Sequence, residues 1–329
     1  MLKQLLTGCA LVASLTLATA VARAEEPAEL DFGIISTEAS SSLKTIWEPL
    51  LTDMSKAIGH PIKGFYATDY AGVIEAMRFN KVQVAWFGNA GAIEAVDRAQ
   101  GEVFAHIVYA NGELGYYSLL IVNKDSPLNS LDDLLKSPGK LTFGNGDPNS
   151  TSGFLIPSYY VWAKHDIDIH KFFTRVVDSN HEANLRAVAN HQVDVATNNT
   201  ENVERLTETK PDAIEKIKII WKSPLIPSDP IVWRKDLPAE TKAKIKDFLV
   251  NYGKTGTPEE IAHAKSVLTP MTYAGFVEST DAQLVPIRQT KLFAAKMRIE
   301  NDDKLSAEEK KTQIEPIEQK LEALAKQGS

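Results

Sequence analysis

A short polar segment in the middle of the chain carries side chains that could bind an anion. Residues 141–149 predict a short strand followed by a turn, and Ser150, Thr151, Ser152 and Gly153 then begin a predicted helix. The first N–H groups of a helix have no partner within it and carry a partial positive charge, so they bind oxyanions. Three hydroxyl groups would add donors. The segment therefore predicts a site for a tetrahedral oxyanion, and a serine that only caps the helix is the simpler alternative.

Several catalytic and cofactor-binding patterns are missing from the sequence. No GK[ST] follows the first glycine of residues 144–153, so this segment is not a P-loop, and no third glycine completes a dinucleotide fingerprint. Ser150 does not stand in the GxSxG context of a hydrolase nucleophile. No HExxH or carboxylate-rich metal motif occurs. We therefore expect a binding protein rather than an enzyme, with no cofactor and no metal.

A faint internal repeat indicates two further candidate residues. Tyr70 begins one predicted helix and His181 begins another, and in each case a strand begins twelve residues later, at Val82 and at Val193. The two residues would then occupy equivalent places in two similar α/β halves. Ligands bind beyond the carboxyl ends of parallel strands, so both halves would present loops to one crevice. A histidine taken alone is more often a surface or capping residue, and the repeat is what makes His181 a candidate.

The elements that must position these residues follow an α/β pattern. Short β-branched runs alternate with amphipathic helical patterns, which predicts mostly parallel sheets flanked by helices. Pro157 is an awkward residue in the second turn of its helix and is expected to bend it. The predicted strands are residues 30–35, 62–66, 82–86, 118–122, 141–143, 193–196 and 217–221, and the predicted helices are residues 43–58, 70–79, 90–99, 131–135, 154–164, 181–190, 201–207, 239–252 and the tail over 306–326.

Two extended segments could carry the chain between two halves of the molecule. Residues 115–118 lead into an extended run, and residues 221–230 contain three prolines, which bias the preceding residues to extended conformations. Two such crossings form the kind of hinge that closes around a ligand. The expected organisation is a discontinuous first lobe over residues 25–117 and 228–300, a second lobe over 118–227, and a helical extension over 301–329.

The first residues predict export. Lys3 precedes an uncharged apolar run, and Ala24 ends a small-x-small site before two glutamates, which together predict a cleavable signal peptide over residues 1–24. Cys9, the only cysteine, stands in a sequence like a lipoprotein box but precedes the apolar run, so we expect no lipidation. Loss of Lys3 and Arg23 with the leader would change the net charge from −7 to −9, which argues against nucleic acid and anionic membranes as partners.

Several stretches together resemble one family. Residues 32–38, 69–72, 142–153, 193–201 and 221–234 are similar to the phosphonate-binding proteins of phosphonate ABC transporters, the PhnD family. The resemblance implies a two-lobed periplasmic binding protein of type II, with its ligand in the interlobe cleft, that delivers a phosphonate to the membrane permease of an ABC importer. It also implies eight ligand-binding residues at matching positions: Tyr70, Tyr116, Ser150, Thr151, Ser152, His181, Glu201 and Asp229.

Two of these eight residues are acidic and do not suit an anion. Glu201 and Asp229 would repel a phosphonate group, and burying them without partners is costly. They suit a ligand that also carries an ammonium group, of which 2-aminoethylphosphonate is the preferred example. The alternatives are phosphite, phosphate or another small oxyanion, and a role as a ligand-loaded adaptor for a membrane sensor.

The C-terminal segment is less similar to the family. Its composition predicts a charged, solvated helix interrupted by Pro316. Its apolar residues form a stripe, through which a homodimer could associate: Ile314, Ile317, Leu321 and Leu324.

Overall fold

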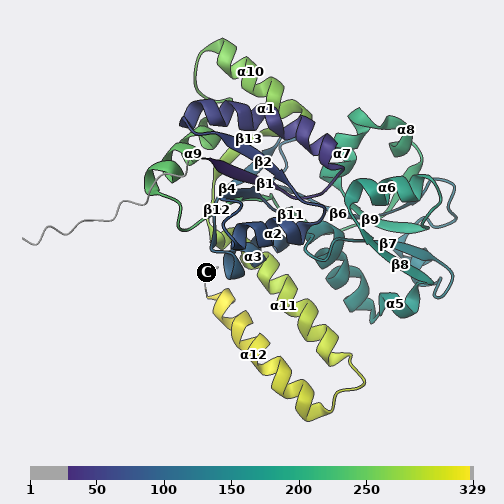
Figure 1. Ribbon diagram of the computed structural model, residues 1–329. Helices are drawn as coiled ribbons and strands as arrows, with labels where there is room; N and C mark the ends of the chain where they lie inside the picture. The colour runs from purple at the N-terminus through teal and green to yellow at the C-terminus, as the bar shows by residue number, and fades with distance from the viewer. Residues whose placement is uncertain (1–28, 327–329) are drawn as a thin grey trace, which may run out of the picture.

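The structure, a computed structural model, describes residues 29–326 and shows two α/β lobes beside each other with a helical hairpin projecting from the molecule (Figure 1). The predicted signal peptide over residues 1–24 and the predicted lipoprotein-like cysteine, Cys9, lie outside the described residues. Among residues 29–326, no helix combines the length and apolar character needed to cross a membrane.

The first lobe is built on a six-stranded sheet. Its strands are β1 (Leu30–Ile34), β2 (Ile62–Tyr66), β3 (Val84–Trp86), β4 (Gly101–Tyr109), β12 (Pro230–Arg234) and β13 (Tyr273–Glu278). They lie in the order β13-β4-β12-β3-β1-β2. β1 pairs parallel with β2 and β3, whereas β12 is antiparallel to β3 and β4, and β13 is antiparallel to β4.

Aromatic side chains form the centre of the first lobe. Its helices are α1 (Ser40–Ile58), α2 (Tyr70–Arg78), α3 (Asn89–Arg98), α9 (Ala239–Asn251) and α10 (Pro258–Leu268). Trp47 of α1 stacks on Trp86 of β3 with ring centroids 5.3 Å apart. Phe32 of β1 packs on the Trp47 ring with centroids 5.4 Å apart. All three side chains are buried. This packing fixes the end of β3, from which the chain enters the cleft.

The second lobe has a smaller sheet that is covered on both faces. Its strands are β6 (Ser118–Asn123), β7 (Thr142–Gly146), β8 (Arg175–Ser179), β9 (Val195–Asn199) and β10 (Ile217–Lys222), in the order β10-β6-β9-β7-β8. Side chains of a strand alternate between faces. Accordingly, Leu120 and Val122 belong to one apolar cluster, and Leu119 and Ile121 belong to another.

The helices of the second lobe include an unusual run after β7. This run consists of two π-helical turns, η1 (Thr151–Leu155) and η2 (Ser158–Trp162), followed by a 3₁₀ turn, η3 (Ala163–His165). The α-helices of this lobe are α4 (Leu131–Leu135), α5 (Ile169–Phe172), α6 (His181–Ala189), α7 (Thr200–Thr209) and α8 (Pro211–Ile214).

The two predicted crossings lie side by side between the lobes. β5 (Gly115–Tyr116) pairs antiparallel with β11 (Ile226–Pro227). A Cβ atom at Gly115 would lie 1.9 Å from the carbonyl oxygen of Ile226, so this close approach requires glycine. The hinge is therefore a small two-stranded ribbon rather than two independent linkers.

The expectation of mostly parallel sheets was wrong, because both sheets are mixed. The chain leaves the first lobe after β5, crosses back through β11, and inserts β12 between β3 and β4 in the antiparallel direction. In the second lobe, β7 pairs parallel with β8 and β9, but β6 is antiparallel to both β9 and β10. Each sheet is parallel only where helices connect successive strands, as crossovers require.

The internal repeat is visible in the structure. α2 and α6 are both nine residues long, and their N-caps, Asp69 and Asn180, accept hydrogen bonds from the backbone N–H of Gly72 and Ala183. Each helix leads to a strand that begins fourteen residues after the helix start, β3 in one lobe and β9 in the other. Tyr70 and His181 are the first residues of these two helices, as predicted.

The chain ends in an antiparallel helical hairpin (Figure 1). It consists of α11 (Val285–Glu300) and α12 (Ala307–Ala325), whose first turn is fixed by a capping box between Ser306 and Glu309. α12 contains no buried residue. It runs continuously through Pro316, so the predicted interruption of the helix at this proline was wrong. The four apolar residues of the predicted stripe are half-buried: Ile314, Ile317, Leu321 and Leu324.

Candidate functional site

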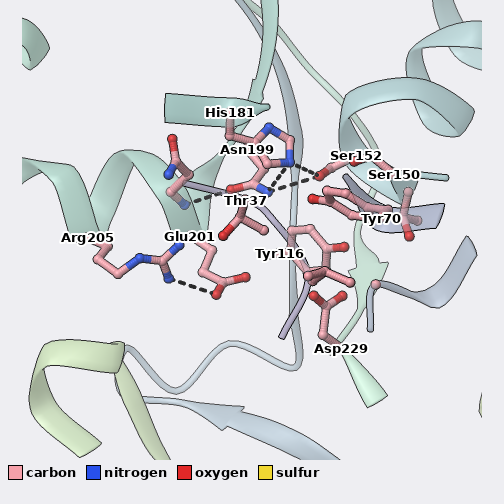
Figure 2. A pocket seen from close by; sticks show the side chains of 14 residues that line it. Thr37, Tyr70, Tyr116, Ser150, Ser152, His181, Asn199, Glu201, Arg205 and Asp229 are labelled. Carbon is pink, nitrogen blue, oxygen red and sulfur yellow. Dashed lines mark hydrogen bonds and ion pairs between the residues drawn. The ribbon is translucent and has the colours of Figure 1, made fainter. Parts of the chain in front are cut away.

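The cleft between the lobes contains one pocket that collects all the predicted site residues (Figure 2). Besides the eight predicted residues, Arg205 and several small or polar residues line it. The full lining is Ile35, Thr37, Tyr70, Gly88, Tyr116, Ser150, Thr151, Ser152, His181, Asn199, Glu201, Asn202, Arg205 and Asp229.

Helix N-termini from both lobes converge on this pocket. α2 and α6 present their first residues, Tyr70 and His181, while the N-cap residues Gly88, Ser150 and Asn199 precede α3, η1 and α7. Each helix start carries unpaired N–H groups and a partial positive charge. The arrangement therefore creates a field that favours an anion in a protein whose net charge is negative.

The hydroxyl segment has both the capping and the site geometry. Ser150 Oγ accepts a hydrogen bond from the backbone N–H of Gly153 at 3.0 Å, so this serine does cap its helix. Thr151 Oγ1 crosses the cleft and accepts from the backbone N–H of Ala90 at 2.8 Å. Ser152 Oγ accepts from Asn199 Nδ2 at 3.0 Å. All three hydroxyl residues are buried and line the pocket, so capping and ligand binding are not exclusive.

The π-helical turns explain Pro157. In a π-helix, the N–H of residue i bonds to the carbonyl of residue i−5, which would pair residue 157 with Ser152. Proline has no N–H, so the Ser152 carbonyl is left without that partner. Ser118 Oγ donates to this carbonyl at 2.6 Å instead. The expected bend is therefore accommodated by a changed hydrogen-bond pattern, supported from the neighbouring strand.

His181 contributes a neutral ring. Burial and, to a smaller extent, the nearby positive charge of Arg205 lower its pKa to about 3. Its Nε2 atom lies 3.2 Å from Asn199 Nδ2 and 3.4 Å from Ser152 Oγ. Its Nδ1 atom is buried and has no protein partner. The anion-facing wall therefore consists of neutral hydrogen-bonding groups.

The opposite wall is acidic. Glu201 Oε1 is bound by Arg205 Nη1 at 3.0 Å and by the Tyr273 hydroxyl at 3.1 Å. Asp229 Oδ2 accepts from Trp86 Nε1 at 3.2 Å, whereas its Oδ1 is buried without a partner. Burial, together with repulsion from Glu201, raises the pKa of Asp229 well above its usual value.

Tyrosine hydroxyls also line the pocket as protonated donors. Burial raises the pKa of Tyr70 and of Tyr116 well above the usual value for a phenol, and the negative charges around them raise it further. Both side chains are almost fully buried. They can therefore donate to an anion or to a carboxylate, and neither contributes a charge.

The structure brings the eight predicted residues together, but six further lining residues were not predicted: Ile35, Thr37, Gly88, Asn199, Asn202 and Arg205. Thr37, whose Oγ1 is buried without a partner, lies three residues after the end of β1, and Asn199 is the last residue of β9; both stand in segments that the resemblance had included. Arg205 stands four residues after Glu201, a spacing that usually marks an exposed helical ion pair. Here both side chains are buried, with 5% and 4% of their surface exposed. The position of these polar residues at strand ends was the available signal.

Comparisons with known proteins agree with this geometry. Residues 32–284 match a family described as the periplasmic substrate-binding protein of phosphonate ABC transporters. The chain is 54% identical to the phosphonates-binding periplasmic protein of Escherichia coli over 312 residues, covering 94% of this chain and 90% of that protein. A phosphate-import protein of Mycolicibacterium smegmatis is 27% identical over 275 residues, covering 80% of this chain and 84% of that protein.

A solved structure shows the same fold. The binding-protein component of an ABC phosphonate transporter from Pseudomonas aeruginosa has a TM-score of 0.88 and 52% sequence identity, covering 92% of this chain and 98% of that one. The predicted type II binding-protein fold is confirmed. The protein belongs to the periplasmic substrate-binding proteins of phosphonate ABC transporters, which are transport components and not enzymes.

Proposed function

We propose that this protein binds an amine-bearing phosphonate, with 2-aminoethylphosphonate as the best candidate, and delivers it to an ABC importer. The observation that supports this most directly is the division of the pocket into two chemically opposite walls. One wall offers helix N-termini and neutral donors to an anion, and the other offers two buried carboxyl groups to a cation. A ligand with both charges a few bonds apart complements both walls.

The phosphonate group is assigned to the wall of the second lobe. Ser150, Thr151 and Ser152 would donate from hydroxyl or backbone groups, and His181 and Thr37 offer buried polar atoms that no protein group occupies. Each hydrogen bond to a charged group contributes roughly 1.5–3 kcal/mol net. About six bonds of this kind are enough for micromolar or tighter binding, which requires about 8 kcal/mol.

The ammonium group is assigned to Glu201 and Asp229. The buried Oδ1 of Asp229 is the main support, because it makes no hydrogen bond of normal geometry, although the Tyr116 hydroxyl lies close enough to lower the pKa of this carboxyl, and an ammonium group would supply a strong donor. Tyr116 lies beside Asp229, whereas Tyr70 lies beside Ser150 in the same pocket (Figure 2). A ligand without an amine would leave this acidic wall unmatched.

Calorimetry with two ligands and two variants tests this assignment. We expect wild-type protein to bind 2-aminoethylphosphonate more tightly than methylphosphonate. Glu201→Gln and Asp229→Asn should each lower the affinity for 2-aminoethylphosphonate by roughly 10- to 100-fold, which corresponds to the loss of a hydrogen bond to a charged group. Each should lower the affinity for methylphosphonate much less. Equal losses for both ligands would refute the ammonium assignment.

Phosphate or phosphite import is the second candidate ligand class. It is favoured by the identity shared with the mycobacterial protein named for phosphate import. Phosphate titrated in the same calorimeter separates the two candidates, since tighter binding of phosphate than of 2-aminoethylphosphonate would favour this class. An adaptor role for a membrane sensor predicts that a deletion strain still grows on a phosphonate as its phosphorus source, whereas the transport role predicts that growth is lost.

The remaining proposals concern the mature chain and its assembly. The signal peptide is removed after Ala24 without lipidation, which mass spectrometry of the exported protein would test. The moving units are the first lobe, over residues 25–117 and 228–300, and the second lobe, over residues 118–227. The C-terminal extension over residues 301–329 carries a homodimer contact, supported by the half-buried apolar stripe of α12, a helix in which no residue is fully buried.

A further inference from the structure

A buried ion cluster extends from the pocket to a residue behind it. Glu38 follows β1 in the first lobe and is 3% exposed, but it does not line the pocket. Its Oε1 atom accepts from Arg205 Nε at 2.5 Å and from Asn202 Nδ2 at 3.1 Å, both on α7 of the second lobe. Arg205 reaches Glu201 on its other side at 3.0 Å. Glu38, Arg205 and Glu201 therefore form a continuous series that ends at the pocket.

The charges in this series determine what Glu201 can offer a ligand. One guanidinium lies between two carboxylates, so the cluster has one negative charge in excess. Burial alone would lower the pKa of Arg205, but Glu38 and then Glu201 raise it above its usual value, so Arg205 stays charged. Without the charge of Glu38, the guanidinium would be balanced by Glu201 alone, and the cluster would present no net charge to the cleft. Charges interact strongly at these short distances because the site is largely withdrawn from water.

We propose that Glu38 is a specificity-determining residue that selects amine-bearing phosphonates without touching them, by occupying Arg205 and so leaving the negative charge of Glu201 available to the ligand ammonium. This inference rests on the proposed function. It assigns Glu38 a positioning and electrostatic role and predicts an effect on ligand choice rather than on binding in general.

A simpler role for Glu38 is that of an interlobe latch, meaning a contact that only holds the two closed lobes together. Glu182, which also joins the lobes, provides the matched control. Glu182, at the start of α6, also joins the two lobes: its Oε2 accepts from the backbone N–H of Ala39 at 3.0 Å. Its other contacts are with Lys210 at 3.0 Å and Arg186 at 3.1 Å, outside the series that contains Glu201. Loss of a latch would weaken closure around any ligand, so it would reduce the affinity for both phosphonates equally.

The test compares affinity ratios of full-length mature protein. We expect Glu38→Gln to lower the ratio of 2-aminoethylphosphonate to methylphosphonate affinity by about tenfold or more. The reason is that the charge of Arg205, no longer balanced by Glu38, would act on the ligand ammonium at the effective dielectric constant of a protein site. Glu182→Gln should leave this ratio within about twofold, whatever it does to closure. An unchanged ratio in Glu38→Gln, or equal losses for both ligands, would overturn the proposal in favour of the latch.

A charge-compensating double variant keeps the test decisive. Glu38→Gln with Arg205→Gln removes one negative and one positive charge, so the net charge of the cluster stays as in wild type, and it also avoids an underpaired buried arginine if the single variant folds poorly. We expect the double variant to regain most of the wild-type ratio, and a ratio as low as that of Glu38→Gln would contradict the proposal. If wild-type protein does not prefer 2-aminoethylphosphonate, both the proposed function and the present inference fail. If wild type prefers that ligand and Glu38→Gln retains the preference, only the present inference fails.

Discussion

Single residues divide the pocket into an acidic wall and a neutral wall, and their ionisation follows from burial. Asp229 and His181 are both almost fully buried, but burial moves their pKa values in opposite directions, since it disfavours the charged form of each. The site thus offers neutral groups to an anion and a proton-holding carboxyl group to a cation. Both shifts lead to measurable pH effects.

Asp229 should make ligand binding depend on proton release. Its pKa is raised in the free protein by burial and by Glu201, and an adjacent ammonium group would lower it. Binding of 2-aminoethylphosphonate therefore releases a proton between the two pKa values, and affinity rises with pH there by up to about tenfold per unit. Calorimetry in two buffers with different ionisation enthalpies measures this release.

The Asp229→Asn variant is the control for that measurement, because the same ligand then meets an amide that cannot ionise. We expect fewer protons to be released by the variant than by wild type at the same pH. Identical proton release from both proteins would show that the protons come from the ligand or from another residue.

His181 should reduce stability in acid. Its pKa falls from 6.5 to about 3 on folding, so the unfolded chain binds a proton between these values and the folded protein does not. Stability is therefore retained above pH 6.5 and is lost as pH falls toward 3, by on the order of 2–3 kcal/mol between pH 7 and pH 4.5. Urea unfolding of wild type and His181→Gln at both pH values tests this. A loss in acid that is equally large in the variant would assign it to other groups.

Element geometry explains how a proline fits beside the anion site. The π-helical turns place the Ser152 carbonyl where Pro157 supplies no donor, and Ser118 on β6 supplies one. The serine hydroxyl is thus a structural replacement for a missing backbone N–H. It also ties the hydroxyl segment to the middle of the second sheet.

Removal of that donor should be costly. Ser118→Ala leaves a buried carbonyl without a partner, so we expect a loss of about 1–3 kcal/mol in the free energy of unfolding. Ser266→Ala is the matched control, since its hydroxyl also donates to a carbonyl, at 2.7 Å, but on an exposed helix face. Its expected change is within about 0.5 kcal/mol. Similar effects in both variants would mean that a water or another group replaces Ser118.

The elements also show which features the sequence could predict. Helix starts near the site were located to within a residue or two, because N-cap residues such as Asp69 and Asn180 act locally. β4, β12 and β13 were not predicted as strands. β13 contains Gly275 at φ 139°, and β12 begins at a proline, so neither resembles a regular strand. Their places depend on pairing between segments far apart in the chain.

The site was predictable to the extent that its residues follow strands or begin helices. Ser150, Thr151, Ser152 and His181 satisfy that condition, and all lie in the pocket. Arg205 could not be distinguished from a surface partner of Glu201, because its burial depends on Glu38 from the other lobe. The contact between them spans 167 residues and exists only when the lobes meet.

At the scale of the whole molecule, the pocket and the C-terminal hairpin are separate parts. No residue of α11 or α12 lines the pocket. α12 packs along α11, to which it is joined by a salt bridge of 2.5 Å between Lys296 and Glu318. The hairpin lines no part of the pocket, but α11 packs against both lobes, since Phe293 stacks on Tyr159 of η2 and Arg288 binds Asp97 of α3.

Deletion of residues 302–329 should separate assembly from binding. We expect the truncated protein to sediment as a monomer, whereas the full mature chain sediments as a dimer, because the stripe of α12 is lost. Its affinity for 2-aminoethylphosphonate should stay within about twofold, since the closing lobes are intact. A full-length monomer, or a truncated dimer, would contradict the assembly proposal.

The hinge ribbon would give lobe closure a fixed centre of rotation. β5 and β11 are bonded to each other, so lobes that close as proposed would turn about this ribbon rather than slide along two loose linkers. Points near a rotation axis travel least. Tyr116 lies on the ribbon itself, and Asp229 lies two residues beyond it. Their mutual spacing would thus be nearly the same at every opening angle, whereas the hydrogen bond from the Ala90 N–H to Thr151, which joins the two lobes, would form only on closure.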